Sequence, residues 1–359
     1  MMVGRVAAVI AGIALVVWVL DAAVRNFLLP RPTRVMMTRW LASWGPGGLL
    51  GRAARRADDY RTKDRLVAAR PVLTLLTFQV VWLTLVFFGF ALIYWGGGAH
   101  IHQSLDQSGS ALFTLGFATP RNAVPQALVY AEALVGLTLL ALLISYLPTI
   151  YAAFQRREFM VSKLVVRTGA KTTPWGALVD SQRTESLDLL DELWADWENW
   201  FVDIAETHTS LTILNFYRSP QRGNHWVKTA RTVLDTASLR IAVMADPAPI
   251  QANIALRSGT LALRTLCNHL GIEYPPDPKP TDPISVTREQ FDAACVLLTE
   301  GGLDLHEDLD QAWLDFRGWR VNYDVTICRL ADFLIAPHDP WTTVAEADLT
   351  STQEPLNDP

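Results

Sequence analysis

Three apolar segments approach or reach the length that a helix needs to cross a lipid bilayer, about 20 residues. They are residues 3–20, residues 71–95 and residues 124–147, the last of which continues through Pro148 to residue 154. The middle segment carries no charge, the first contains only Arg5, and the third contains only Glu132. Hydrocarbon offers no water to the backbone, so each segment must satisfy its own peptide groups as a helix. The sequence therefore predicts an all-α membrane protein with three spanning helices, the first within residues 1–24.

The charges are divided unevenly along the chain, and this division gives the topology. Residues 1–170 carry 17 Lys and Arg against 7 Asp and Glu, whereas residues 171–359 carry 14 against 29. The linker 25–70 alone holds 11 basic and 3 acidic residues, and such segments stay in the cytoplasm. A cleaved signal peptide at the N-terminus is disfavoured, because export would carry this linker the wrong way. We expect a multi-pass inner-membrane protein with its N-terminus and residues 96–125 outside and an acidic cytoplasmic remainder.

Within the linker, apolar and basic side chains alternate closely. This pattern predicts an interfacial segment that lies against anionic lipid headgroups. Nucleic-acid binding is the rival interpretation of a basic stretch, but membrane helices tether the linker on both sides. We therefore expect lipid and not nucleic acid as a partner. The residues concerned are Arg34, Met36, Met37, Arg39, Trp40, Leu41 and Trp44.

The outside loop 96–125 contains an apolar stretch, SALFTLGFA, that a hydrophilic loop does not need. Apolar chain between two membrane helices can dip back into the bilayer only where protein covers it or where it lines water. Residues 104–113 are long enough for a short re-entrant helix, and residues 114–118 would return as extended chain.

The order of helix, pore helix, T-x-G-[YF]-G and inner helix is the pattern of two-transmembrane potassium channels, and residues 114–118 follow it as T-L-G-F-A. The stretches EALVGLTLLALLISYLPTIYAAFQRRE and ETHTSLTILNFYRSP add to the match. The chain resembles a bacterial family of channel-like membrane proteins with a helical cytoplasmic extension. The resemblance implies a pore domain over 71–154, with outer helix 71–95, pore helix and filter 104–118 and inner helix 124–154.

The chemistry of such a loop can be stated from its residues. A dehydrated cation, here potassium as the permeant ion, needs a ring of oxygens, and backbone carbonyls supply them. Gly116 allows the backbone to turn its carbonyls inward at positive φ, and the Thr114 hydroxyl adds an oxygen at the inner end. One chain has one such loop, and the resemblance implies four copies, a homotetramer. The expected filter residues are Thr114, Leu115, Gly116, Phe117 and Ala118.

Three residues depart from the channel pattern. Ala118 stands where a second filter glycine is expected, and left-handed geometry costs an L-residue about 1–2 kcal/mol. Thr119 stands where an Asp usually follows, and Arg121 would repel cations at the mouth unless it pairs with Asp106. These departures leave a second hypothesis open, a non-conducting sensor or scaffold whose cytoplasmic domain binds a ligand or partner.

The inner helix offers three further candidates. Glu132 shares a helix face with Gly136, and either braces the filter and tunes its charge or lies near the outer headgroups. Gly136 is a flexing point or a small residue at a close helix contact. Pro148 removes a helical hydrogen bond near the cytoplasmic exit, where it kinks the helix or marks the end of the span. Gly136 and Pro148 are thus the gate or hinge candidates.

The cytoplasmic half contains a heptad seam of bulky apolar residues, which predicts a globular helical bundle. We expect a linker over 155–183, a helical domain over 184–336 with a break at 274–283, and a largely disordered tail over 337–359. The seam residues are Leu187, Leu190, Trp194, Trp197, Phe201, Ile204, His208 and Leu211.

Residues that could carry chemistry in this half are few. Glu206 and His208 with His225, or His306 with Asp310, have metal-ligating types, but no metal motif contains them, and His208 belongs to the seam. No nucleotide-binding or nucleophile motif is present, so a membrane-anchored enzyme is the weakest hypothesis. We expect no enzymatic activity, metal or other cofactor. A small basic cluster remains as a possible anion contact, formed by Arg218, Arg222, His225 and Lys228.

Overall fold

The computed structural model describes residues 2–27, 45–120, 122–169, 172–183, 187–221, 224–337 and 341. These residues form helices and connecting loops, with one isolated bridge between Met244 and Leu305, so the all-α prediction is confirmed for them. The chain divides into two compact units, Met1–Ala152 and Ala153–Pro359. The division falls within one helix, α6 (Ala123–Thr168), close to residue 154, where the predicted pore domain ends.

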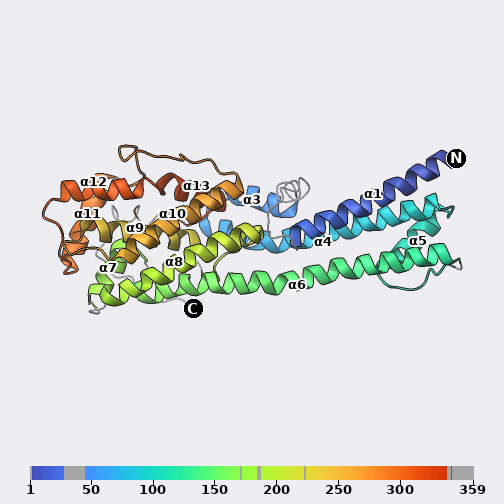
Figure 1. Ribbon diagram of the computed structural model, residues 1–359, viewed down its shortest axis with the longest axis horizontal. Coiled ribbons are helices and arrows are strands. Elements are labelled where there is room, and N and C mark those ends of the chain that lie inside the picture. The colour runs from blue at the N-terminus through green and yellow to red at the C-terminus, as the bar shows by residue number, and fades with distance from the viewer. Residues whose placement is uncertain are drawn as a thin grey trace. The chain divides into compact units, whose positions relative to one another are not determined.

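Among the described residues, three helices are long and apolar enough to cross a membrane, and the first unit contains two of them, α1 and α4, and the part of the third, α6, up to Ala152. Figure 1 shows α1 running along α4, and α5 lying beside α4 and α6. Its other helix, α3, packs on α4 through its glycines. The helices of this unit are α1 (Met2–Phe27), α3 (Pro46–Arg56), α4 (Tyr60–Gly96), α5 (Ile101–Leu112) and the first part of α6.

Two helices are longer than the apolar segments predict. The helix α4 begins at Tyr60, where the Asp59 side chain accepts a hydrogen bond from the Thr62 backbone, so Pro71 lies inside it. The helix α6 continues to Thr168, and helix α7 (Pro174–Arg183) follows, so most of the predicted linker 155–183 is helical. The reason is packing: this end of α6 buries Val161 and its neighbours in the core of the second unit.

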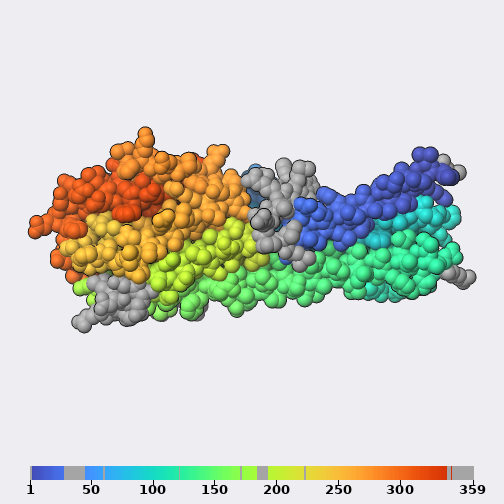
Figure 2. Space-filling view, viewed as in Figure 1, coloured from blue at the N-terminus to red at the C-terminus, as the bar shows by residue number. Residues whose placement is uncertain are grey.

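Helices α1 and α4 approach closely because glycines face the contact. A Cβ placed on Gly89 would lie 2.8 Å from Cγ2 of Val16. Small residues let membrane helices pack by direct van der Waals contact. Around this point Val16 and Val19 pack with Trp82, Val86 and Phe90. Figure 2 shows the surface of α1 against that of α4, so the first helix is a structural part of this unit.

The second unit is a helical bundle built around the almost entirely buried helix α9. The predicted seam lies on α8, and its described members from Trp194 to His208 are buried, which confirms that part of the prediction. The elements of this unit after α7 are α8 (Leu187–Ser210), the 3-10 helix η1 (Thr212–Phe216), α9 (Trp226–Val243), α10 (Ile250–Leu270), α11 (Arg288–Glu300), α12 (Leu309–Arg320) and α13 (Asp324–Leu334).

The proline-rich stretch 274–283 is an ordered strap on the bundle. Three arginines from three helices donate to its backbone carbonyls and those next to it, which replaces the hydrogen bonds that prolines cannot supply. The pairs are Arg329 to Glu273, Arg264 to Pro276 and Arg317 to Thr281. The predicted break is therefore a surface loop of one bundle.

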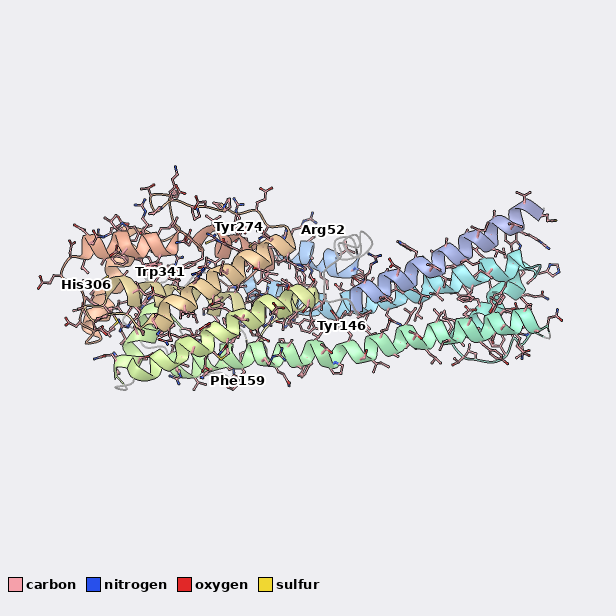
Figure 3. All side chains as sticks on the ribbon, viewed as in Figure 1. Arg52, Tyr146, Phe159, Tyr274, His306 and Trp341 are labelled. Carbon is pink, nitrogen blue, oxygen red and sulfur yellow. The ribbon has the colours of Figure 1, made fainter. Side chains whose placement is uncertain are left out.

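Trp341 extends the packed core past residue 336, into the predicted tail 337–359. Its side chain is buried (Figure 3), and its Nε1 donates to Oδ2 of Asp235 at 2.7 Å. Arg320 and Tyr323 donate to Oδ1 of the same carboxylate, which is fully buried. One indole from the predicted tail thus completes a buried polar network of the second unit.

Candidate functional site

The predicted pore helix is α5, which begins three residues before the expected start at 104. Its 12 residues span roughly 18 Å at about 1.5 Å per residue, too short for a hydrocarbon core of about 30 Å. Ser108 lies opposite Glu132 of α6, and one turn later Leu112 lies opposite Gly136. These two pairs show that α5 runs in the same direction as α6.

Glu132 of α6 connects this helix to α4 and α5 through its carboxyl group. Its side chain is 0% exposed. Its Oε2 lies 3.0 Å from the Tyr94 hydroxyl of α4, and its Oε1 lies 2.5 Å from the Ser108 hydroxyl of α5. This geometry agrees with the bracing role and not with a place among headgroups.

Gly136 is a close-contact residue. A Cβ at this position would lie 2.9 Å from the carbonyl oxygen of Leu112, the last residue of α5. Real Cβ atoms essentially never approach that closely, so any side chain would push α5 away from α6. Of the two roles considered for Gly136, the structure favours close packing.

The chain leaves α5 through an unusual residue, Thr114. The Leu115 backbone N–H bonds the Ser110 carbonyl at 2.8 Å, and the Thr114 N–H bonds the Ala111 carbonyl at 3.1 Å. This pair of bonds is a Schellman closure, which needs a left-handed residue and usually has glycine there. Thr114 takes that position with φ of 55°. For a β-branched residue this conformation is an outlier that costs about 1–2 kcal/mol.

A second left-handed residue follows two positions later. Gly116 has φ of 74°, as expected, and nothing lies within 4 Å of the place where its Cβ would be. The apolar side chains of Leu115 and Phe117, on either side of it, are 64% and 65% exposed. The loop therefore carries left-handed residues at alternate positions and leaves its large side chains uncovered by its own chain.

The alternation ends before Ala118. This residue does not have positive φ, and its N–H bonds the Ser110 hydroxyl at 3.0 Å, which ties the returning chain to α5. Thr119 is exposed. Arg121 lies outside the described residues, so neither its predicted place at the mouth nor the alternative pairing with Asp106 is described. Asp106 is exposed on α5.

Pro148 lies on an exposed face inside α6, and the helix continues past it to Thr168. Its missing N–H leaves the Ile144 carbonyl without the usual helical donor. Two residues before it, the ring of Tyr146 packs edge-on against Phe27 of α1, with ring centroids 4.6 Å apart (Figure 3). The inner helix thus contacts α1 beside its proline.

Two of the four basic residues proposed for an anion contact make internal hydrogen bonds. Arg218 donates to the Ile335 carbonyl at 2.6 Å, and His225 caps α9 by accepting from the Val227 N–H at 3.1 Å. Burial, reinforced by Arg218, lowers the pKa of His225 well below its usual value, and burial also lowers the pKa of Lys228. Arg222 lies outside the described residues. These contacts do not favour an anion site.

His208 is a core residue. It is fully buried next to Arg157, which donates to the carbonyls of Leu214 and Tyr217 at 3.0 and 2.9 Å. Burial, and then the neighbouring guanidinium, lowers the pKa of His208 well below its usual value. Within the described ranges no group of three His, Cys, Asp or Glu side chains is placed to hold a metal ion.

The sequence interpretation missed the serines that organise the loop. Ser108 and Ser110 are buried, and they bond Glu132 and the Ala118 backbone respectively. The sequence could have predicted this role. Hydroxyls on a helix that re-enters the membrane need hydrogen-bond partners, because an unbonded polar group in hydrocarbon is costly.

No protein-family model, curated protein or solved structure matches the chain. Three features of the first unit remain as the basis for a function. They are the Glu132 contacts behind α5, the left-handed residues at 114 and 116, and the uncovered side chains of the loop.

Proposed function

We propose that the chain is one subunit of a homotetrameric pore-loop channel that conducts potassium passively across the cell membrane. In this proposal α5 is a re-entrant pore helix. The carbonyls from Thr114 to Phe117 then line the ion path, and the sequence T-L-G-F-A follows the filter pattern of two-transmembrane potassium channels except at Ala118.

The observation that carries the proposal is the left-handed threonine. Glycine would close α5 without strain, so a threonine there costs stability and brings a hydroxyl in return. A hydroxyl at the inner end of a carbonyl-lined path adds an oxygen ligand for a dehydrated cation. Residues held in strained conformations are common where a ligand or ion is bound.

The uncovered surfaces support several copies around one axis. The α6 span is the least buried of the three spans. One stripe of its exposed residues repeats at alternating steps of four and three, the spacing that a face packed against copies of itself would have. The residues of this face are Tyr130, Leu134, Leu137, Ala141, Ile144, Pro148 and Tyr151.

The orientation in the proposal follows the charges. The basic residues of 45–70 and of the end of α6 are on the cytoplasmic side, together with the second unit, and the loop 96–125 is outside. The channel needs lipid and its own copies as partners, with no cofactor and no catalysis. A ligand for the second unit is not specified by its residues.

The proposal is tested by Gly116→Asp in purified protein reconstituted into liposomes. A side chain at this left-handed position strains the loop and obstructs the ion path, so potassium flux should disappear while the assembly persists. Gly169→Asp is the matched control, because Gly169 also has positive φ and open space around it but lies in the second unit. Equal flux from Gly116→Asp and wild type would overturn the carbonyl-filter proposal.

A non-conducting scaffold is the second candidate, and Ala118 favours it. The left-handed alternation stops one step short of the channel pattern, since the Ala118 N–H bonds Ser110. If wild-type protein forms tetramers but passes no cation at any gradient, the scaffold replaces the channel.

A further inference from the structure

The hydroxyl of Ser108 has one proton to donate, but it lies within hydrogen-bond distance of two oxygen atoms. It lies 2.8 Å from the carbonyl oxygen of Phe87 on α4 and 2.5 Å from Oε1 of Glu132 on α6. A serine hydroxyl donates one hydrogen bond, whereas a carbonyl oxygen and an ionised carboxylate can only accept. An ionised Glu132 would therefore leave one of these two short oxygen contacts without a hydrogen atom.

We propose that Glu132 is a protonated positioning residue, whose carboxyl proton connects α6 to α5 and through it to α4. The acid donates from Oε1 to Ser108, Ser108 donates to the Phe87 carbonyl, and the Tyr94 hydroxyl donates to Oε2. Every proton is then used once and no oxygen faces another without a hydrogen. The link to ion passage rests on the proposed channel function, while the protonation stands on this geometry alone.

The surroundings of Glu132 favour the neutral acid. The side chain is fully buried, and its two hydrogen-bond partners are hydroxyl groups. A charged carboxylate inside a membrane costs about 2.5–3.5 kcal/mol on insertion scales, and a neutral acid avoids that cost. Apart from Glu132, the titratable side chains of residues 79–96 of α4, of α5 and of residues 123–145 of α6 are Tyr94, the exposed His102 and Asp106, and Tyr130.

The acid lies where it can set the position of the loop. One turn after Ser108, the end of α5 contacts Gly136 of α6, and the next residues form the left-handed closure at Thr114. Loss of the Glu132 proton would leave one of the two short contacts at Ser108 without a hydrogen, and α5 would lose its bond to α4 or to α6. Glu132 is therefore expected to act on the loop through α5, without touching the ion.

The first test is infrared spectroscopy on the full-length protein in lipid at neutral pH. Wild type should show a protonated-carboxyl carbonyl band that Glu132→Gln lacks. Asp106→Asn is the control for the band, because it removes an exposed carboxyl from the neighbouring helix α5 and should leave the band in place. If the wild-type minus Glu132→Gln difference contains only ionised-carboxylate bands, the proposal is wrong, whether or not the protein conducts.

The second test compares two replacements of Glu132. The Gln amide can donate to Ser108 and accept from Tyr94, as the neutral acid does, so Glu132→Gln should keep thermal stability and potassium flux within about twofold. Leucine has neither group, and Glu132→Leu should lower flux by about tenfold through the buried polar groups left unpaired. Equal damage by both replacements would show that the carboxylate charge is needed and would overturn the proposal. If wild type carries no flux, the infrared and stability comparisons still decide the protonation.

Discussion

At the residue scale, replacing Thr114 is expected to affect thermal stability and ion preference in opposite directions. Its positive φ costs about 1–2 kcal/mol relative to glycine. Thr114→Gly should therefore leave thermal stability unchanged or raise it, while it lowers the preference for potassium over sodium because the hydroxyl is gone. Thr114→Ser keeps the hydroxyl and should keep the preference. Reversal potentials under potassium and sodium gradients, with melting curves of the same samples, measure both effects. Undiminished selectivity of the glycine variant would remove the hydroxyl from the ion path.

Single residues also show what sequence can and cannot predict. The positive φ of Gly116 was predictable, because glycine adopts left-handed geometry at little cost. That of Thr114 was not, because it arises from the carbonyls of Ser110 and Ala111 that close α5, against the preference of threonine itself. The conformation of Ala118 depends likewise on the Ser110 hydroxyl. The backbone conformation of Gly116 follows from its own preference, whereas those of Thr114 and Ala118 follow from their hydrogen-bond partners.

At the scale of elements, two buried histidines, one in the last turn of α8 and one capping the start of α9, make stability depend on pH. His208 and His225 are buried, and their pKa values lie well below the usual value. The unfolded chain takes up protons near pH 6.5, whereas the folded chain does not, so stability is full above that pH and falls below it. We expect a loss approaching about 1.4 kcal/mol per pH unit for each histidine.

Urea unfolding of the full-length protein in detergent, followed by Trp fluorescence between pH 5.5 and 8, measures this loss. The matched variant is His208→Gln, which removes one titrating group and should roughly halve the slope below about pH 6.5. A stability that does not change over this range would mean that the two histidines have the same pKa in the folded and unfolded chains, which would contradict the lowered pKa values.

The elements themselves were largely predictable, and their ends were not. Apolar length predicts the three spanning helices, and the heptad pattern predicts the buried face of α8. The continuation of α6 to Thr168 and the strap over 274–283 escaped prediction. Both depend on partners distant in sequence, a core face in the first case and three arginines in the second.

At the scale of the whole molecule, the charge division predicts a sidedness that can be tested without any flux. Asp58→Cys should resist an impermeant maleimide in intact cells and react after permeabilisation, whereas His102→Cys should react in both; both positions are exposed. The native cysteines give a built-in reference, since Cys267 and Cys295 are buried and Cys328 is half-buried in the second unit. Labelling of residue 58 in intact cells would reverse the proposed topology.

Trp341 has a consequence for the order of events during synthesis. Its indole donates to Asp235, a residue 106 positions earlier in the chain. A ribosome releases the chain from the N-terminus onward. The Asp235 carboxylate of α9, which is buried in the folded unit, is therefore synthesised long before its partner Trp341. By then all three spanning helices have been made, since α6 ends at Thr168. In the proposed homotetramer, nascent subunits can therefore meet in the membrane while their second units are still unfinished, and early recognition between copies would fall to the spanning helices.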